Sequence, residues 1–186
     1  MTDAAGTLTV ERVQSARRRV EAYLAEQLGD LGVDMAAMAQ QAGAMSGVEW
    51  LERWLRPEIP PPPPLGMLFG IEWDEIEKSR VALSFEPAEW MFSPFGTIFG
   101  GVTATVLDTV LGAAVHTALP AGTGYATTDL HTRFIRAVTR ETGRVSATGT
   151  LVHAGRRHAT ADGRVEAVAT GKLIATGTAH CAILRP

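Results

Sequence analysis

The stretch Ser93–Asp108, SPFGTIFGGVTATVLD, decides the fold, because a glycine-rich turn leads directly into an almost wholly apolar helix that carries one acid. Gly100 and Gly101 lie where the pattern changes from loop to helix. Their backbone N–H groups are therefore expected to be unpaired donors at the positive end of the helix dipole. Because glycine has no side chain, a carbonyl oxygen or an anion can approach these donors closely.

The spacing of Gly100 and Asp108 indicates that one helix cannot bring both to the same bond. At ~1.5 Å per residue they lie ~12 Å apart along the helix axis. An antiparallel copy of the helix would place Asp108 of one chain beside Gly100 of the other, and Gly101, Ala104 and Gly112 form a strip of small residues that allows close packing. This predicts a composite site at a two-fold dimer interface, with oxyanion donors from one subunit and a carboxylate from its partner. The residues alone leave a second interpretation open, in which Asp108 faces solvent and the glycines only form a turn.

Composition and charge are those of a globular protein with a real core. The chain has 186 residues, of which 46% are hydrophobic and 20% charged, and its net charge of −3 gives no attraction toward nucleic acid. No apolar run approaches the ~20 residues of a membrane span. The N-terminus lacks the apolar segment of a secretory signal, so we expect a cytoplasmic protein that binds no nucleic acid and no membrane. One cysteine, Cys181, excludes an intrachain disulfide, and the five histidines show no metal-ligand spacing, so no metal is expected.

The N-terminal third is predicted to be a helical appendage. Residues 1–59 show helical periodicity, and SGVE at Ser46–Glu49 is a capping box that starts a helix. Trp50 and Trp54, on one side of that helix, are interpreted as packing residues rather than a ligand platform. Residues 60–64 are five consecutive prolines, which we interpret as an extended linker to the following domain.

Residues 65–186 are predicted to form a domain of strands around one long helix. The helix, from Gly101 to about Ala118, is apolar almost all round, as expected if a sheet wraps it. The hydrophobic period of the flanking segments shifts toward two, and Gly-containing turns separate them. The expected strands are Met67–Glu72, Arg80–Phe85, Tyr125–Ile135, Arg144–His153, Arg157–Glu166 and Lys172–Ile183.

Several motifs follow one another in the order of a known family. GTIFGG at 96–101 precedes ATVLD at 104–108, and TTDL at 127–130, VHAGRR at 152–157 and GKLIATGT at 171–178 come later. Together they resemble the hotdog-fold acyl-CoA thioesterases of the PaaI (phenylacetate-degradation) type. That family's pattern is an Asn, then Gly-Thr, His-Gly-Gly, and a helix with Ala-Thr-Leu-Leu-Asp. The similarity covers roughly two-thirds of the chain, from about Leu65 to Leu184.

The resemblance implies an α+β hotdog fold, in which an antiparallel sheet wraps a long central helix, here with an N-terminal helical extension. It implies hydrolysis of acyl-CoA thioesters by a homodimer or a dimer of dimers, with no cofactor beyond the CoA of the substrate. Asp108 would be the base or nucleophile, the Gly100 N–H the oxyanion donor, and Thr127 and Ser93 would position the water or the carboxylate. The substrate-binding residues implied are Phe99, Gly101, Thr128, Arg136, Gly155, Arg156 and Arg157.

For some of these residues the sequence leaves a second role open. Thr127 and Thr128 alternate across a strand, so only one can face the site, and the register of the match favours Thr127. Asp129 is a second acid, which we expect to serve a turn or the interface. Arg156 and Arg157 would hold the phosphates of CoA or simply form a solvated turn.

Two departures from the family pattern motivate an alternative function. Ser93 stands where the family has Asn, Phe99 stands where it has His, and a smaller departure is Ala137 in place of Pro. A non-catalytic acyl-CoA-binding or sensing protein is therefore the first alternative. A regulator whose N-terminal helices bind DNA rests only on Arg17–Arg19, and the acids around that run favour a solvated helix face.

Overall fold

The computed structural model describes residues 10–30, 34–56 and 64–185. The chain divides into two compact units, Met1–Asp34 and Met35–Pro186. The described part of the first unit is mainly one helix, α1 (Val10–Asp30), whose valines at 10, 13 and 20 are exposed. None of the described helices is both long enough and apolar enough to cross a membrane.

The second unit begins with α2 (Met35–Ala44), α3 (Gly47–Glu52) and the 3-10 helix η1 (Arg53–Leu55). The predicted capping box is confirmed, because Ser46 Oγ accepts from the Glu49 N–H and Glu49 Oε2 accepts from the Ser46 N–H. Gly47 packs directly against the end of the central helix, where an added Cβ would lie 1.8 Å from the carbonyl oxygen of His116. These helices therefore belong to the same compact unit as the sheet.

The prediction of a strand at Met67–Glu72 is wrong, because the chain forms helix α4 (Pro64–Phe69) there. Residues 60–63 of the proline run lie outside the described residues, and Pro64 opens α4 instead of extending a linker. Proline suits the first position of a helix, where its missing N–H costs nothing. Gly70, at φ 62°, ends the helix: its N–H donates to Met67 O and the Ile71 N–H donates to Gly66 O, a Schellman motif.

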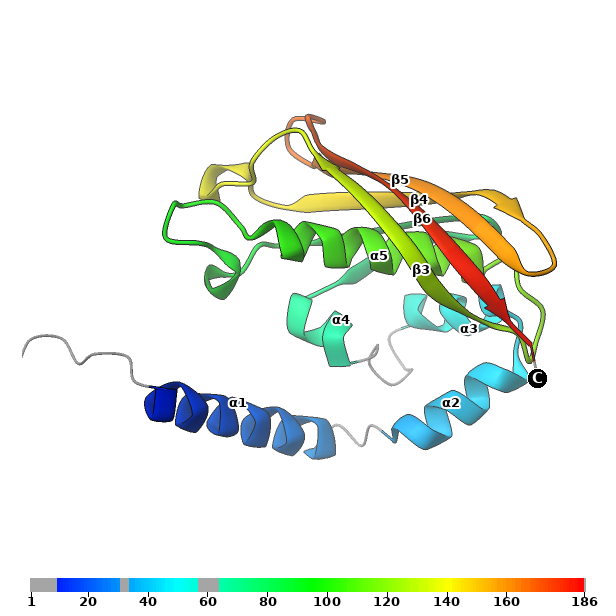
Figure 1. Ribbon diagram of the computed structural model, residues 1–186, viewed down its shortest axis with the longest axis horizontal. Helices are drawn as coiled ribbons and strands as arrows, with labels where there is room; N and C mark the ends of the chain where they lie inside the picture. The colour runs from blue at the N-terminus through cyan, green and yellow to red at the C-terminus, as the bar shows by residue number, and fades with distance from the viewer. Residues whose placement is uncertain (1–9, 31–33, 57–63, 186) are drawn as a thin grey trace, which may run out of the picture. The chain divides into compact units, whose positions relative to one another are not determined.

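Six antiparallel strands form one sheet in the order β1-β2-β4-β5-β6-β3 (Figure 1). The last five agree with the expected strands to within two residues at each end, and the first strand starts at Glu72 instead of Met67. Two further 3-10 turns, η2 (Glu89–Met91) and η3 (Arg140–Thr142), lie in the connections. The strands are β1 (Glu72–Glu77), β2 (Arg80–Phe85), β3 (Gly124–Phe134), β4 (Val145–Ala154), β5 (His158–Ala167) and β6 (Leu173–Leu184).

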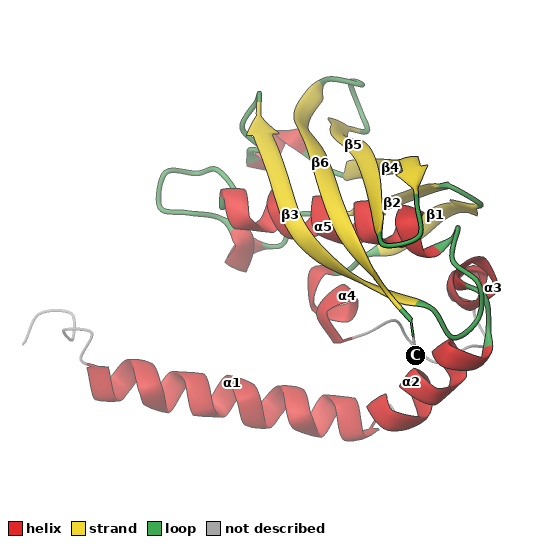
Figure 2. Ribbon diagram, turned by 45° about the vertical axis from the view of Figure 1, so that its right-hand side comes forward, coloured by secondary structure: helices red, strands yellow, loops and turns green. Residues whose placement is uncertain are grey.

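The central helix α5 (Gly100–His116) lies between this sheet and the short helices α3 and α4 (Figures 1 and 2). Three glycines in register, Gly149, Gly163 and Gly177, cross the sheet beneath it. An added Cβ on Gly149 would lie 2.5 Å from the carbonyl oxygen of Val110, and one on Gly177 would lie 3.1 Å from the Leu107 side chain. The glycines therefore allow the helix to sit deep in the curved sheet.

Candidate active site

The N-terminus of α5 carries unpaired backbone donors. Its N-cap, Phe99, has extended backbone angles (φ −61°, ψ 136°) and no side-chain group that caps the helix. Phe99 O accepts from the Val102 N–H, and in the part of the chain that the structure describes no acceptor faces the N–H groups of Gly100 or Gly101. Space around Gly101 is open, since nothing lies within 4 Å of an added Cβ. These donors are thus available to an incoming oxygen.

The loop before α5 is held in place by its own hydrogen bonds. The Phe99 N–H donates to Met91 O and the Ile98 N–H donates to Val138 O. Ser93 closes a turn, in which its N–H donates to Thr97 O at 2.8 Å and its hydroxyl accepts from the Phe95 N–H at 3.3 Å. The Ser93 hydroxyl therefore stabilises the loop within its own chain.

Asp108, in the middle of α5, is half-buried. Thr127 Oγ1, on β3, donates a hydrogen bond of 2.9 Å to Asp108 Oδ1. The pairing of β3 with β6 shifts register between Thr127 and Asp129, which marks a β-bulge at Thr128. The structure thus brings Thr127 to Asp108, whereas Thr128 Oγ1 donates to His180 O at 3.1 Å and Asp129 is exposed.

Asp108 lines a cavity of about 300 Å³ between α5 and the helices below it. Its polar side chains include Asp108, Thr109, His116 and Tyr125. Burial raises the pKa of the Tyr125 hydroxyl and lowers the pKa of the His116 imidazole, so both groups are neutral at pH 7. The apolar and aromatic lining comes from Trp50, Leu51, Trp54, Leu65, Gly66, Ile71, Trp73 and Ala113.

Sequence reasoning missed this cavity because its wall comes from six separate elements, α3, η1, α4, β1, α5 and β3. Trp50 and Trp54 do pack on each other, edge to face with ring centroids 5.4 Å apart, and they also line the cavity. Tyr125 lies over Gly112, where an added Cβ would be 2.5 Å from its hydroxyl oxygen. Gly112 leaves space on the surface of α5, and an aromatic residue follows at the start of β3. These two features of the sequence could have placed Tyr125 beside the helix.

The other residues expected to bind substrate lie at two ends of the sheet. The Phe99 side chain is 56% exposed, and the ring of Phe134 lies against Gly100. Arg136 Nη1 donates to Leu173 O at 2.6 Å. Gly155, Arg156 and Arg157 form the turn between β4 and β5, in which the Gly155 N–H donates to His158 O and both arginines are exposed.

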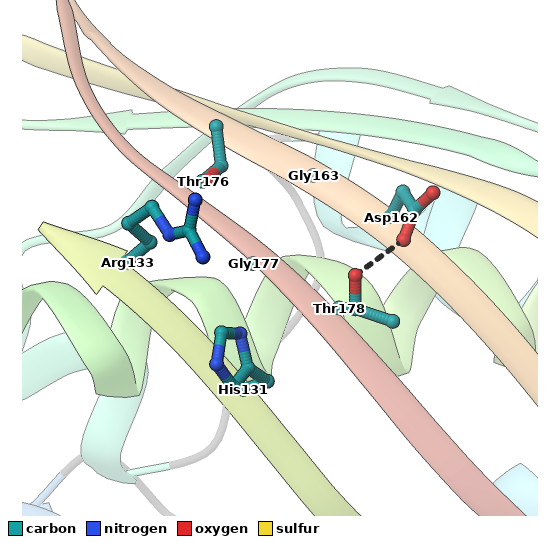
Figure 3. Close-up of a pocket in the computed structure, with 7 residues that line it drawn as sticks. All are labelled: His131, Arg133, Asp162, Gly163, Thr176, Gly177 and Thr178. Carbon is teal, nitrogen blue, oxygen red and sulfur yellow. Dashed lines mark hydrogen bonds between the residues drawn. The ribbon is translucent and has the colours of Figure 1, made fainter. Parts of the chain in front are cut away.

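A second cavity, of about 340 Å³, opens on the sheet over β3, β5 and β6 (Figure 3). Its lining includes His131, Arg133, Asp162 and Thr178, and Thr178 Oγ1 donates to Asp162 Oδ1 at 2.6 Å. This open polar surface contains one carboxylate, Asp162, but all the residues that line it lie on strands, and none is at the N-terminus of a helix. Within the described ranges, no group of three or more His, Cys, Asp or Glu side chains could hold a metal ion.

Comparison with known proteins finds one matching family model. The family model described as "Thioesterase superfamily" matches residues 95–174, which include Gly100, Asp108 and Thr127. No curated protein matches the chain. A thioesterase family protein from Silicibacter pomeroyi superposes with a TM-score of 0.64 at 22% identity, covering 76% of this chain and 98% of that chain.

Two further solved structures share the fold. A putative thioesterase from Ralstonia eutropha, described as a phenylacetic acid degradation-related protein, has a TM-score of 0.63 and 26% identity, covering 70% of this chain and 97% of that chain. AziG from S. sahachiroi has a TM-score of 0.63 and 24% identity, covering 67% of this chain and 98% of that chain. The expected hotdog architecture, a six-stranded antiparallel sheet around a long helix, is confirmed.

Proposed function

We propose that this chain, whose hotdog domain belongs to the thioesterase superfamily, hydrolyses acyl-CoA thioesters to a free acid and CoA. The observation that carries the proposal is the environment of Asp108. Its carboxylate accepts a hydrogen bond from Thr127 and lines an aromatic cavity, and the same helix begins with unpaired N–H groups. A positioned carboxylate and preorganised oxyanion donors are the two groups that acyl transfer to water requires.

In the proposed reaction, the thioester carbonyl oxygen accepts a hydrogen bond from the Gly100 N–H, and the positive end of the α5 dipole strengthens that bond. Asp108 takes a proton from a water that attacks the carbonyl carbon, and this proton passes to the departing sulfur. Alternatively, Asp108 attacks that carbon itself, and water then hydrolyses the mixed anhydride to the free acid and supplies the proton for the sulfur. A C–O bond forms, the C–S bond breaks, and the sulfur of CoA leaves with a proton as the thiol. Thr127 holds the carboxylate in a single orientation.

We propose further that the site is shared between two copies of the chain, in a dimer or a dimer of dimers. Gly100 and Asp108 of one helix are separated by ~12 Å, so the donor must come from another helix. Three observations support a second copy at this side of the molecule. In the described sheet β3 is an edge strand, Phe99 and Phe134 expose large apolar surfaces beside Gly100, and Gly101 faces open space.

Steady-state hydrolysis of a panel of acyl-CoAs, followed by release of the free thiol, tests the proposal. Asp108→Asn should lower kcat by about a hundredfold or more, because an amide accepts no proton from water. The amide oxygen can still accept from Thr127, so the fold and the affinity for CoA should persist. Asp162→Asn is the matched control, since that carboxylate lies on the second cavity, and it should remain within a few-fold of wild type.

Two results would contradict the proposal. One is turnover by Asp108→Asn within a few-fold of wild type. The other is tight acyl-CoA binding by the wild-type protein without any hydrolysis, which would identify a binding or sensing protein, as the departures at Ser93 and Phe99 suggested.

A further inference from the structure

The segment Gly47–Leu55, which forms α3 and η1, lies outside the residues that the family model matches. It nevertheless supplies Trp50 and Trp54 to the wall of the cavity that contains Asp108. We propose that this segment is a specificity element, in which the two tryptophans form the far wall of the acyl-binding cavity and limit the size of the acyl group. The proposal rests on the thioesterase function proposed above.

The segment is held rigidly enough to act as a wall. Its start is fixed by the capping box at Ser46 and by the Gly47 N–H, which donates to Leu119 O at 3.0 Å just beyond the end of α5. Its aromatic side chains are fixed by one another and by Arg53, whose guanidinium lies 5.2 Å from the centroid of the Trp50 ring. Arg53 Nη1 also donates to Gln41 Oε1 of α2 at 3.1 Å. Ring positions set by such contacts resist displacement by a ligand.

The lining of the cavity has a polar side and an apolar side. Asp108, Thr109 and the Tyr125 hydroxyl mark the polar side, on α5 and β3. Tryptophan and aliphatic side chains from α3, η1, α4, β1 and the link between α4 and β1 make up most of the rest, including Trp54 and Ile71. An acyl-CoA fits this distribution with its thioester beside Asp108 and its hydrocarbon against the tryptophans.

The volume of the cavity sets the size of the group that it can hold. A dry cavity of ~150 Å³ is enough to bind benzene. About 300 Å³ therefore accommodates an acyl group of ring or medium-chain size and excludes a long fatty acyl chain. Removing an indole from the wall would enlarge the cavity.

The proposal is tested with Trp54→Ala and Trp54→Phe, because Trp54 is only partly buried whereas Trp50 is part of the core. Trp90→Ala is the matched control: Trp90 is 52% exposed, packs on Phe69 and does not line the cavity. For each variant, kcat/KM is measured over straight-chain acyl-CoAs of increasing length. Binding of non-hydrolysable acyl-CoA thioethers of the same lengths is measured by calorimetry.

Trp54→Ala should raise kcat/KM for long chains relative to short chains by about tenfold or more, since one or two methylenes in an apolar pocket are worth that much. Trp54→Phe should shift the profile in the same direction by less, and it provides the answer if Trp54→Ala does not fold. Trp90→Ala should keep the wild-type profile. A Trp54→Ala profile identical to that of Trp90→Ala, in both hydrolysis and binding, would overturn the inference.

The binding series separates this inference from the proposed function. If Asp108→Asn keeps its turnover, the catalytic proposal fails, yet a length preference in thioether binding that relaxes in Trp54→Ala still supports the wall. If the wild-type protein binds no acyl-CoA thioether of any length, both proposals are overturned.

Discussion

Thr127 and Asp108 make the contact on which the proposed chemistry depends. The two adjacent threonines at 127 and 128 look equivalent in the sequence, and strict alternation would place Asp129 on the same face as Thr127. The β-bulge at Thr128 breaks that alternation, so Thr127 faces Asp108 while Asp129 points to solvent. A bulge depends on pairing with β6, which the local sequence does not reveal, and this is why Asp129 stayed open as a second acid.

Removing the Thr127 hydroxyl should impair catalysis, and restoring it should rescue catalysis. A hydrogen bond to a charged group is worth ~1.5–3 kcal/mol, so Thr127→Val should lower kcat/KM by about tenfold or more. Thr127→Ser keeps the hydroxyl that bonds Asp108 Oδ1 and should stay close to wild type. The measurement is hydrolysis of one good acyl-CoA substrate. Equal losses in the two variants would mean that the side chain only fills space.

At the scale of elements, sequence patterns predicted the strands after the central helix well and failed where the chain enters the sheet. The apolar run before Glu72 suits a strand as well as a short helix, because a few residues carry too little periodicity. Pro64 and Gly70 decide the outcome. Proline suits the first turn of a helix, and Gly70 adopts φ 62° directly after the last residue of α4. Reading those two residues as caps would have predicted α4.

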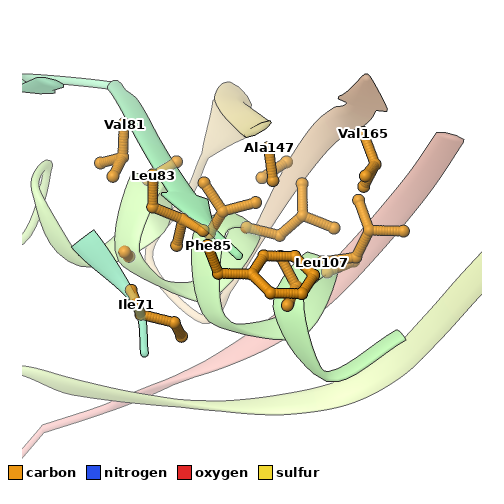
Figure 4. Packing of buried hydrophobic residues seen from close by; sticks show 14 of the residues in the cluster. Ile71, Val81, Leu83, Phe85, Leu107, Ala147 and Val165 are labelled. Carbon is orange, nitrogen blue, oxygen red and sulfur yellow. The ribbon is translucent and has the colours of Figure 1, made fainter. Parts of the chain in front are cut away.

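The sequence predicted that the sheet wraps α5, but the close approach of the helix to glycines inside the strands was not predicted, because only the Gly-containing turns between strands were interpreted. The core that surrounds the helix is continuous, with Phe85, Leu107 and Val165 all fully buried and close together (Figure 4). Gly149 is the point of closest approach, since its nearest neighbours are backbone atoms of Val110 and Leu111, which cannot swing aside.

Gly149→Ala should therefore lower the free energy of unfolding by about 2 kcal/mol, the usual cost of overpacking a core. Gly43→Ala, inside α2 with nothing within 4 Å of the added Cβ, should instead raise it by up to about 1 kcal/mol. Denaturant unfolding of both variants measures these opposite effects. A neutral Gly149→Ala would show that the helix does not press on the sheet at this residue.

For the whole molecule, the order of motifs predicted the hotdog fold because each motif is local. The family model, which matches residues 95–174, covers these motifs apart from the end of the one at 171–178. The cavity could not be predicted in the same way. Its wall joins Trp54 to Asp108 and Tyr125, which are far apart in the sequence, and the packing of α3 against the end of α5 helps to bring them together. Trp50 and Trp54 were interpreted as packing residues, and the structure shows that a packing residue can line a cavity as well.

The central claim is that the site is composed of Asp108 from one chain and the Gly100 N–H from another. Gly100→Pro removes that N–H at the first helical position, where proline is favoured, and the extended backbone of Phe99 is compatible with a following proline. Gly100→Ala keeps the N–H and adds a comparable Cβ beside Phe134, so it controls for the contact with that ring.

The most direct test mixes Asp108→Asn with Gly100→Pro, each inactive alone, and measures acyl-CoA hydrolysis by the verified heterodimers. In each heterodimer one site combines an intact Asp108 with an intact Gly100 N–H, and the other site lacks both. Verified heterodimers should therefore show about half of the wild-type activity, and an unseparated equimolar mixture should show about a quarter. Heterodimers that remain as inactive as the two parent variants would contradict a site shared between chains.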